Sequence, residues 1–557
     1  KRGPFDIMRP AGLKAAYALV SAGNIDAAAA AIKAFLSERP DQAQGYYDLG
    51  VLQLYEKRLS PAARAFAQAA TLKSGYFEAL RNLSVVWRRL GDHDNALNYL
   101  TQAVDLRPSA HDLIFNLGNT FRDLGQLAEA IACYRRVLEI KFDFWPAHSN
   151  MLLAEQYREG HTAASLFELH SAFGKKFPTS RSIWPTDADR LDPERRLRIG
   201  FLSPDLGTHP VGFFLIGPLA HFDRTKLETY CYSDRQPDTI THDIQQMTDH
   251  WRESVTWSDD ALIERINEDR IDILFDLAGH TARNRLPMFA RKPAPLSVTW
   301  AGYVGTTGLG TIDYLLVDRF VSVDEEKYYS EKVLRMPHSW TTYTPPLYAP
   351  ACSPLPARTN GFTTFGSFSN PNKINASTID LWAKILRAVP NAVLVLKYNA
   401  MDSPHQVRRI TALFAANGIG KERFILEGGA SHADFIARYA EIDLALDTFP
   451  YSGGLTTYEA LWMGVPVVAK NGKTFASRHA LGILQAVGLP ELVGEDGSEY
   501  LDKAVSLANN WDRLASMRDG LRTRVAASPV CDHAGFAAHF TDLMRAIWRQ
   551  YCADVVT

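Results

Sequence analysis

The sequence predicts a helical repeat domain followed by two α/β domains, each built around a parallel sheet. Residues recur every 34 positions through roughly the first 180 residues, a period typical of paired-helix repeats. After residue 194, two series of short apolar runs alternate with helical stretches, which is typical of parallel sheets covered by helices. A proline-rich segment, 344–356, separates the two series and is expected to be a linker.

Two positions define the repeat. They are Gly23, Lys57, Gly91 and Gly125, and, five residues after each, Ala28, Ala62, Ala96 and Ala130. Small residues are expected where the helices of a repeat cross, and one repeat cannot bury its apolar face alone. Stacked repeats are therefore predicted to form a short superhelix over residues 1–180.

A third position at the same interval carries a polar side chain on the first helix of each repeat. The residues are Asp48, Asn82, Asn116 and Asn150. Each asparagine offers a donor and an acceptor, so the three are predicted to bind an extended peptide on the concave face. The alternative is that they hydrogen-bond only between neighbouring repeats.

The apolar runs are candidate strands. They cover 198–203, 228–233, 271–277, 297–300 and 314–318 in the first series, and 363–368, 392–397, 423–427, 444–449 and 466–470 in the second. We therefore predict α/β domains over 181–345 and 346–532, with a cleft between them and ligands at the carboxyl ends of the strands. The segment 533–557, helical at least to residue 551, is expected to pack back on the first α/β domain.

Composition excludes several classes of protein. Sixty Lys and Arg against 62 Asp and Glu give a formal net charge of −2, which does not favour nucleic-acid binding. No run approaches the 18 or so apolar residues of a membrane span. The cysteines are few and lack CxxC spacing, so a reducing compartment, the cytoplasm, is expected.

The segment DTFPYSGGLTTYEALWMGVPVV, 447–468, predicts a phosphate site. A strand ends at Asp447, two glycines follow, and Thr456 and Thr457 open a helix. Glycines let the backbone approach a ligand, and a helix N-terminus offers unpaired N–H groups with a partial positive charge. Glu459 could accept hydrogen bonds from ribose hydroxyls. The alternative is an ordinary capped helix.

Two further segments place polar side chains after predicted strands. In FGSFSNPNKINASTIDLW, 365–382, Asn370 and Lys373 follow a strand, and Lys373 could neutralise a departing diphosphate. In IGFLSPDLGTHPVGFF, 199–214, His209 follows a strand and is a candidate general base. His280, with Thr281 beside it, takes the matching place in DLAGHTARNRL. The alternatives are a solvated lysine and structural histidines.

Other signatures are missing. No GxGxxG follows the first strand, and no GxxxxGK[ST] occurs. The closest approach to a metal-binding DxD, Asp187 and Asp189, falls in the predicted linker at 180–194, and His, Cys and Asp show no metal-ligand spacing. We therefore expect no metal site and no cofactor.

Taken together, these segments resemble the peptide O-linked N-acetylglucosamine transferase family over nearly the whole chain. The more specific strings are SPDLGTHPVG, DLAGHTARNRL, RKPAPLSVTWAGYVGTTGLGTIDY, YYSEKVLRMPHSW and TFPYSGGLTTYEALWMGVPVV. The resemblance implies the GT-B fold, two Rossmann-like domains facing a cleft. It also implies inverting, metal-independent transfer of a sugar, by best guess N-acetylglucosamine, from a UDP donor to Ser or Thr hydroxyls.

The resemblance also implies roles for individual residues. His209 matches the proposed active-site base, and Lys373 matches the lysine that holds the diphosphate. The matched donor-binding positions are Asn370, Ala430, His432, Phe435, Arg438, Gly454, Thr456, Thr457 and Glu459. Phe435 would stack on the base, and Ala430 would meet the uracil edge. Asn82, Asn116 and Asn150 match the family's proposed groove for the acceptor polypeptide.

Some positions depart from the animal members of that family. His432 stands where a lysine is usual, Phe435 replaces a histidine and Asn370 replaces a glutamine. Two other functions remain open: a nucleotide-sensing adaptor without turnover, and a sugar-nucleotide epimerase, which the repeats disfavour because an epimerase needs no polypeptide acceptor. The sequence leaves the donor sugar, the acceptor proteins and the oligomeric state open.

Overall fold

The computed structural model describes residues 13–177, 191–322 and 326–556. Most of the predicted linker, with Asp187 and Asp189, lies outside these residues. The described chain divides into two compact units. One runs to Ala147 and includes the short segment Ser403–His405, and the other contains the remainder from His148.

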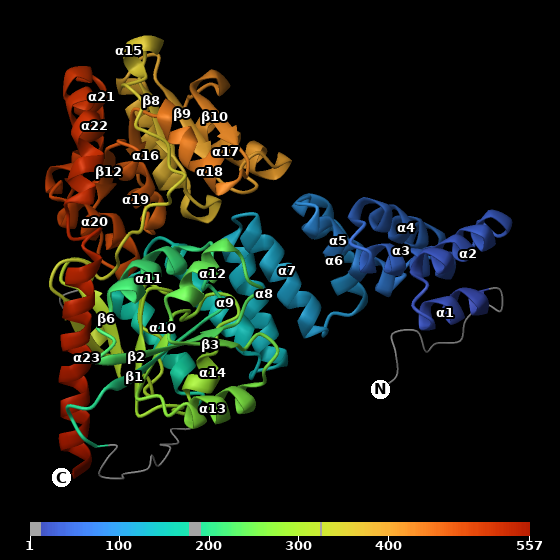
Figure 1. Cartoon of the computed structure of the whole chain (residues 1–557). Helices are drawn as coiled ribbons and strands as arrows, with labels where there is room; N and C mark the ends of the chain where they lie inside the picture. The colour runs from blue at the N-terminus through green and yellow to red at the C-terminus, as the bar shows by residue number, and fades with distance from the viewer. Residues whose placement is uncertain (1–12, 178–190, 323–325, 557) are drawn as a thin grey trace. The chain divides into compact units, whose positions relative to one another are not determined.

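The first unit is all-helical, as the repeat pattern predicted. Its helices, drawn in blue shades in Figure 1, are α1 Lys14–Ser21, α2 Ile25–Glu38, α3 Ala43–Tyr55, α4 Leu59–Leu72, α5 Phe77–Arg89, α6 His93–Leu106, α7 His111–Asp123 and α8 Leu127–Ile140. They pair in sequence, and each pair packs on the next.

The structure explains both repeated positions. The residues at the first position, Gly23, Lys57, Gly91 and Gly125, all adopt positive φ values between 60° and 81°. This left-handed backbone turns the chain between the paired helices and favours glycine. The alanines at the second position are at most 1% exposed. Larger residues there would push the helices apart.

Helices α9 Trp145–Tyr157 and α10 Ala163–Gly174 continue the repeat pattern, but almost all of their residues belong to the second unit. The unit boundary at 147 therefore precedes the end of the predicted repeat domain at 180. The hairpin is joined to the first α/β domain by hydrogen bonds: His170 Nε2 lies 2.8 Å from the Tyr303 hydroxyl, and Gln156 Nε2 donates to the same hydroxyl at 3.3 Å.

The first α/β domain contains a seven-stranded parallel sheet of order β3-β2-β1-β4-β5-β6-β7. Its elements are β1 Leu197–Ser203, α11 Pro210–His221, β2 Leu227–Ser233, α12 Thr239–Gln246, β3 His250–Glu253, α13 Asp259–Glu268, β4 Ile273–Asp276, α14 Leu286–Phe289, β5 Leu296–Thr299, β6 Tyr314–Asp318 and β7 Lys332–Met336.

The second α/β domain contains a six-stranded parallel sheet of order β10-β9-β8-β11-β12-β13. Its elements are α15 Ala357–Asn360, β8 Thr364–Ser367, α16 Ala376–Ala388, β9 Val393–Lys397, α17 Pro404–Ala416, β10 Phe424–Glu427, α18 His432–Ala437, β11 Leu444–Leu446, α19 Leu455–Trp462, β12 Val467–Lys470, α20 His479–Val487, β13 Val493–Gly494, α21 Gly497–Ala508 and α22 Trp511–Ala526. Short 3-10 turns lie at Glu326–Tyr328, Pro371–Lys373, Lys421–Arg423, Phe475–Arg478 and Pro490–Leu492, and at Arg438–Glu441.

Both sheets have the doubly wound order, in which the chain starts in the middle, moves to one edge and then returns to cross to the other. The reversal leaves a crevice outside the carboxyl ends of the two central strands, where ligands of such folds bind. The central strands are β1 and β4 in the first domain and β8 and β11 in the second. Four of the predicted site segments follow these strands, and the segment 430–438 follows the edge strand β10.

The predicted strands match the central strands and miss three at the edges. Strands β3, β7 and β13 were not predicted. β3 reads His-Trp-Arg-Glu and is not fully buried at any position, whereas β13 has only two residues. Edge strands need neither a continuous apolar run nor great length, so they leave little pattern in the sequence.

The last helix, α23 His533–Val556, lies along the first α/β domain (Figure 1) and contacts α11 and β7. Its Phe540 ring is 4.9 Å from Phe222 and 5.3 Å from Phe275, measured between ring centroids. The chain thus returns to its first sheet after completing the second. None of the described helices is both long and apolar enough to cross a lipid bilayer.

We predict that acid weakens the attachment of the α9–α10 hairpin. Burial lowers the pKa of His170 from 6.5 to about 4 and also lowers that of His280. The folded chain therefore binds these protons more weakly than the unfolded chain. The stabilising contribution of His170 is complete above pH 6.5 and is lost as the pH falls toward 4, by about 2 kcal/mol at pH 5, and that of His280 is lost in the same direction.

Thermal melting at pH 7.5 and pH 5 tests this prediction in the wild type and in His170→Gln. Glutamine can still bond to Tyr303 but has no titratable proton, so the variant is expected to lose less stability between the two pH values. Equal losses of melting temperature in the two proteins would show that protonation of His170 is not the cause.

Candidate active site

A cavity of about 600 Å³ opens between the two α/β domains. Its walls contain residues from the loops after β1, β4, β8 and β11, as the strand order predicts. The predicted residues that line it are His209, Thr281, Asn370, Lys373, Ala430, His432, Phe435, Gly454, Thr456 and Glu459. The volume suits a nucleotide-sized ligand, because small-molecule sites usually span about 300–1,000 Å³.

The turn between β11 and α19 forms one wall. The Gly453 N–H donates to Asp447 Oδ1 at 2.6 Å, which closes the turn. Gly454 occupies the N-cap, and among the described residues no side chain caps the helix. The first N–H groups of α19 are consequently available to an anionic ligand, together with the positive end of the helix dipole.

Lys373 lies beside this turn. Its Nζ donates to the Ser452 carbonyl at 2.8 Å and stands 4.3 Å from the centre of the Tyr451 ring. The lysine is thus held in place and is not a freely solvated loop residue. Burial lowers its pKa to about 8, although the Asp447 carboxylate opposes that shift. Lys373 is therefore mainly cationic at neutral pH.

Asp447 is the acidic partner of Lys373. It is 4% exposed, and burial raises its pKa to about 7 against the Gly453 hydrogen bond and the Lys373 charge. Its Oδ2 atom is buried with no hydrogen-bond partner in the part of the chain that the structure describes. The carboxyl group therefore fixes the turn through one oxygen while its charge supports the cationic lysine.

His432 and Glu459 bond to each other. The His432 Nε2 atom lies 2.7 Å from Glu459 Oε1, and its Nδ1 atom is hydrogen-bonded to the Tyr348 hydroxyl. Phe213 of α11 stacks on the His432 ring at 5.2 Å. Burial raises the pKa of Glu459, and the bond to His432 opposes that rise. These contacts connect the first domain, the linker and the second domain at one wall of the cavity.

An aromatic group lies near Ala430. Phe435 contacts Phe368 edge to face at 5.3 Å, and Phe368 stacks on Tyr439 at 4.2 Å. Phe435 and Phe368 both line the cavity, so they offer a flat ligand ring an apolar surface. Arg438 does not line the cavity. Its guanidinium pairs with Glu427 on β10 at 2.8 Å.

His209 lines the cavity from the first domain, at the N-cap of α11. Its Nδ1 atom accepts a long hydrogen bond, 3.4 Å, from the Val211 N–H and is 3.9 Å from Asp205 Oδ2. The side chain is 40% exposed, and desolvation of the ring by the surrounding protein lowers the pKa of His209. A neutral ring that accepts through Nδ1 carries its proton on Nε2. In this tautomer the Nε2 N–H of His209 can donate a hydrogen bond to a ligand.

His280 does not reach the cavity, although it follows β4 as predicted. It is fully buried, with Nε2 2.8 Å from the Thr307 carbonyl and Nδ1 3.1 Å from Ser149 Oγ on α9. Both ring nitrogens thus bind protein atoms, which corresponds to the structural alternative for this histidine. Thr457 is also buried and outside the lining, whereas Thr281 and Thr456 are in it.

The repeated polar residues that were predicted to bind a peptide are only partly accessible to a ligand. Asp48 is buried, accepts from Gln44 and is hydrogen-bonded to the Tyr17 hydroxyl. The Asn82 amide donates to the Tyr47 hydroxyl at 3.3 Å, so it has a partner in the neighbouring repeat. Asn116 is half-buried and Asn150 is 7% exposed.

Several lining residues were not found from the sequence, including Tyr157, Tyr451 and His479. Tyr157 ends α9 and stacks on Tyr451 at 4.7 Å, with an interplanar angle of 20°. Tyr451 lies inside the quoted 447–468 segment, so that motif could have revealed it. Tyr157 is in a repeat and His479 follows no recognisable motif, so the sequence around them does not indicate that they line a ligand cavity.

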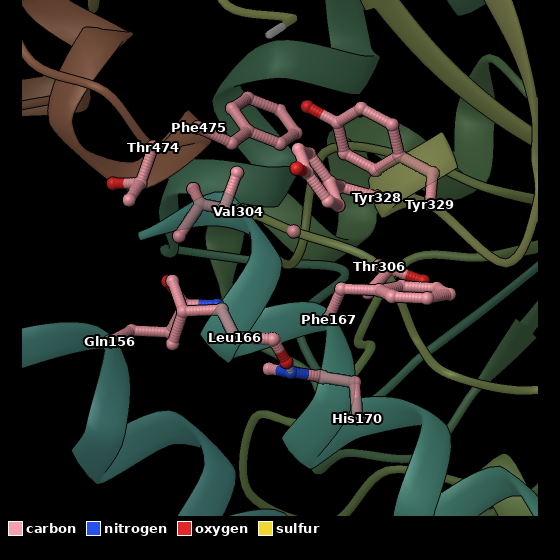
Figure 2. A pocket seen from close by; sticks show the side chains of 12 residues that line it. Gln156, Leu166, Phe167, His170, Val304, Thr306, Tyr328, Tyr329, Thr474 and Phe475 are labelled. Carbon is pink, nitrogen blue, oxygen red and sulfur yellow. Dashed lines mark hydrogen bonds between the residues drawn. The ribbon is translucent and has the colours of Figure 1, made fainter. Parts of the chain in front are cut away.

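A second cavity of about 30 Å³ lies between α10 and the two α/β domains. Figure 2 shows the aromatic rings of Phe167, Tyr328, Tyr329 and Phe475 around it. A volume of this size holds a water molecule or two and no nucleotide. In addition, no group of three or more His, Cys, Asp and Glu side chains within 13–177, 191–322 and 326–556 is arranged to hold a metal ion.

Comparisons with known families agree with this architecture. Residues 179–343 and 357–540 match the model of glycosyl transferase family 41, and residues 13–77 and 83–143 match tetratricopeptide repeats. A Thermobaculum terrenum O-GlcNAc transferase mutant has a similar structure, with a TM-score of 0.84 and 33% identity. The similarity covers 92% of this chain and 98% of that one.

Curated relatives include a Solanum lycopersicum protein described as probable UDP-N-acetylglucosamine–peptide N-acetylglucosaminyltransferase SPINDLY. It is 36% identical over 423 residues, 74% of this chain and 45% of that protein. The Arabidopsis thaliana protein SEC, described as the same probable activity, is 30% identical over 373 residues, 64% of this chain and 38% of its own length. This chain therefore spans less than half the length of these relatives.

Proposed function

Because the chain belongs to glycosyl transferase family 41, we propose that it transfers a sugar from a uridine diphosphate donor to Ser or Thr hydroxyls of proteins. We take N-acetylglucosamine as the sugar, since it is named for the relatives. The observation that carries the proposal is the position of Lys373. It stands beside the uncapped N-terminus of α19 in a nucleotide-sized cavity between two doubly wound domains.

In this proposal the uracil lies near Ala430 and Phe435, and the diphosphate lies at Lys373, Gly454 and Thr456. Glu459 and His432 are next to the ribose. Because His432 occupies one Glu459 oxygen, the ribose hydroxyls compete for the other oxygen or displace the histidine. Asn370, which accepts the Asn372 N–H, holds the turn that carries Lys373.

Transfer is an in-line displacement. The acceptor hydroxyl oxygen forms a bond to the anomeric carbon, the bond to the diphosphate oxygen breaks, and the hydroxyl proton passes to solvent water. Negative charge grows on the departing diphosphate, where the Lys373 ammonium and the α19 N–H groups stabilise it. These groups supply the positive potential, and we propose that the transfer needs no metal ion.

His209 lines the cavity from the first domain and is near the diphosphate in this proposal. Its Nδ1 is occupied by the Val211 N–H, so Nε2 donates a hydrogen bond, and we assign His209 the role of orienting the reacting groups. The repeats bind the acceptor polypeptide in this proposal, with Asn82, Asn116 and Asn150 as candidate contacts to its backbone.

The first prediction concerns Lys373→Ala. Calorimetric titration with UDP in the presence of EDTA is expected to show micromolar binding to the wild type and a loss of roughly 10-fold to 100-fold in the variant, because a charged hydrogen-bond donor to phosphate is removed. Lys384→Ala is the matched control: Lys384 is 47% exposed on α16 and forms an ion pair with Asp380. Near-normal sugar transfer by Lys373→Ala would contradict the assignment.

If the wild type does not bind UDP, the donor side of the proposal fails. If UDP binds but no labelled donor sugar yields a product with any protein acceptor, the adaptor function replaces the transferase.

The second prediction is an alkaline limb in the pH profile. Lys373 loses its proton as the pH rises through about 8, so kcat/KM of the free enzyme is expected to fall above that pH. Arginine stays protonated in this range, so whatever activity Lys373→Arg retains should lack the limb. A limb of the same midpoint in both proteins would show that another group titrates.

The third prediction concerns Tyr157, which stacks on the ring that supports Lys373. Tyr157→Ala is expected to weaken UDP binding roughly threefold to tenfold, the value of one aromatic pair, whereas Tyr157→Phe keeps the stack and the affinity. Equal affinities in the alanine variant and the wild type would exclude this support.

A further inference from the structure

We infer that His479 is an additional diphosphate-binding residue, which donates a hydrogen bond from Nδ1 as a neutral imidazole. The inference rests on the proposed function and adds a contact to it. His479 begins α20, downstream of every segment that carried the sequence prediction, and it lines the same cavity as Lys373 and Gly454.

The orientation of the ring is fixed by packing. The Trp340 ring is 5.0 Å away and the Phe475 ring is 5.9 Å away, between centroids. The Nδ1–Cε1 edge faces the start of α19: a Cβ atom placed on Gly454 would lie 3.1 Å from Nδ1 and 3.5 Å from Cε1. His479 thus points one nitrogen at the N-cap of the phosphate-binding helix.

The two ring nitrogens have different surroundings. Nε2 is buried and has no hydrogen-bond partner among the residues that the structure describes. Nδ1 is not among the buried unpaired atoms, and it borders the cavity at Gly454. A buried N–H without an acceptor is costly, so the single proton of the neutral ring is favoured on Nδ1, where a ligand can accept it.

The ring is neutral at physiological pH. Burial, followed by the positive charge of Lys373, lowers the pKa of His479 to about 3. His479 therefore offers a donor without a second positive charge, which would repel Lys373. The two residues then have different tasks: Lys373 neutralises the diphosphate, and His479 with the α19 N–H groups fixes its orientation.

Calorimetric titration of UDP into His479→Leu and His479→Asn tests this inference. Leucine keeps the packing against Trp340 and Phe475 but removes the donor, so UDP affinity should fall roughly tenfold or more. Asparagine can place an N–H near the position of Nδ1 and should retain most of the affinity. Melting temperatures near that of the wild type confirm that both variants are folded.

Two further measurements distinguish a phosphate contact from a structural role: the affinity for uridine and the pH dependence of the affinity for UDP. The loss in His479→Leu should appear with UDP and be absent with uridine, because the contact is to phosphate. The affinity ratio of wild type to His479→Leu should be the same at pH 6 and pH 8, because the donor is neutral. A ratio that falls toward pH 8 would indicate a cationic histidine and overturn the inference.

Unchanged UDP affinity in His479→Leu, or equal losses in the leucine and asparagine variants, would overturn the inference while the proposed function stands. Failure of the wild type to bind UDP would overturn both. A loss shared by UDP and uridine would assign His479 to the packing of the cavity wall instead.

Discussion

The winding of the two parallel sheets is the constraint on which the site depends. In each sheet the chain begins at a central strand, builds toward one edge, and returns to the centre to build the other half. The returning connection cannot cover the ends of the two central strands, so their following loops remain free to hold a ligand. In this chain those loops carry His209 and Thr281 in one domain, and Lys373 and Gly454 in the other. The cavity is thus a product of topology, and the side chains only define its chemistry.

The positive potential of the site comes from one lysine and one helix N-terminus. Lys373 is kept cationic inside the protein by Asp447, whose carboxyl group also closes the glycine turn. The α19 N-terminus adds partial positive charge without a side chain. Beside this centre, His432 and Glu459 bond to each other. Under the proposed function, one lysine and one helix N-terminus balance the charge of the departing diphosphate and leave little excess positive charge to retain the product.

The repeats and the central strands could be predicted from sequence because their causes are local. A left-handed turn favours glycine every 34 residues, and Lys57 adopts the same left-handed φ at a cost in strain, which is lower for a side chain unbranched at Cβ than for a branched one. The edge strand β3 could not be predicted, because none of its four residues is fully buried and the strand has no apolar run. The same holds for the site. Lys373 and Gly454 follow from strand-to-helix loops, whereas the burial of His280 depends on Ser149 from a distant helix. Tyr157 lies in the predicted repeat domain, before residue 180, so no pattern in the sequence assigned it to a cavity of the α/β domains.

The position of α9 and α10 in the second unit divides the helical array into two parts. The last hairpin is joined through Gln156 and His170 to Tyr303, and its Tyr157 borders the cavity, so substitutions there are expected to alter the cavity itself. Among the described residues, the lining of the cavity comes from Tyr157 and residues that follow it in the chain. Under the proposed function, the earlier helical pairs can vary in number and sequence between related proteins without changing a residue of the cavity, and the choice of acceptor can then change separately from the chemistry.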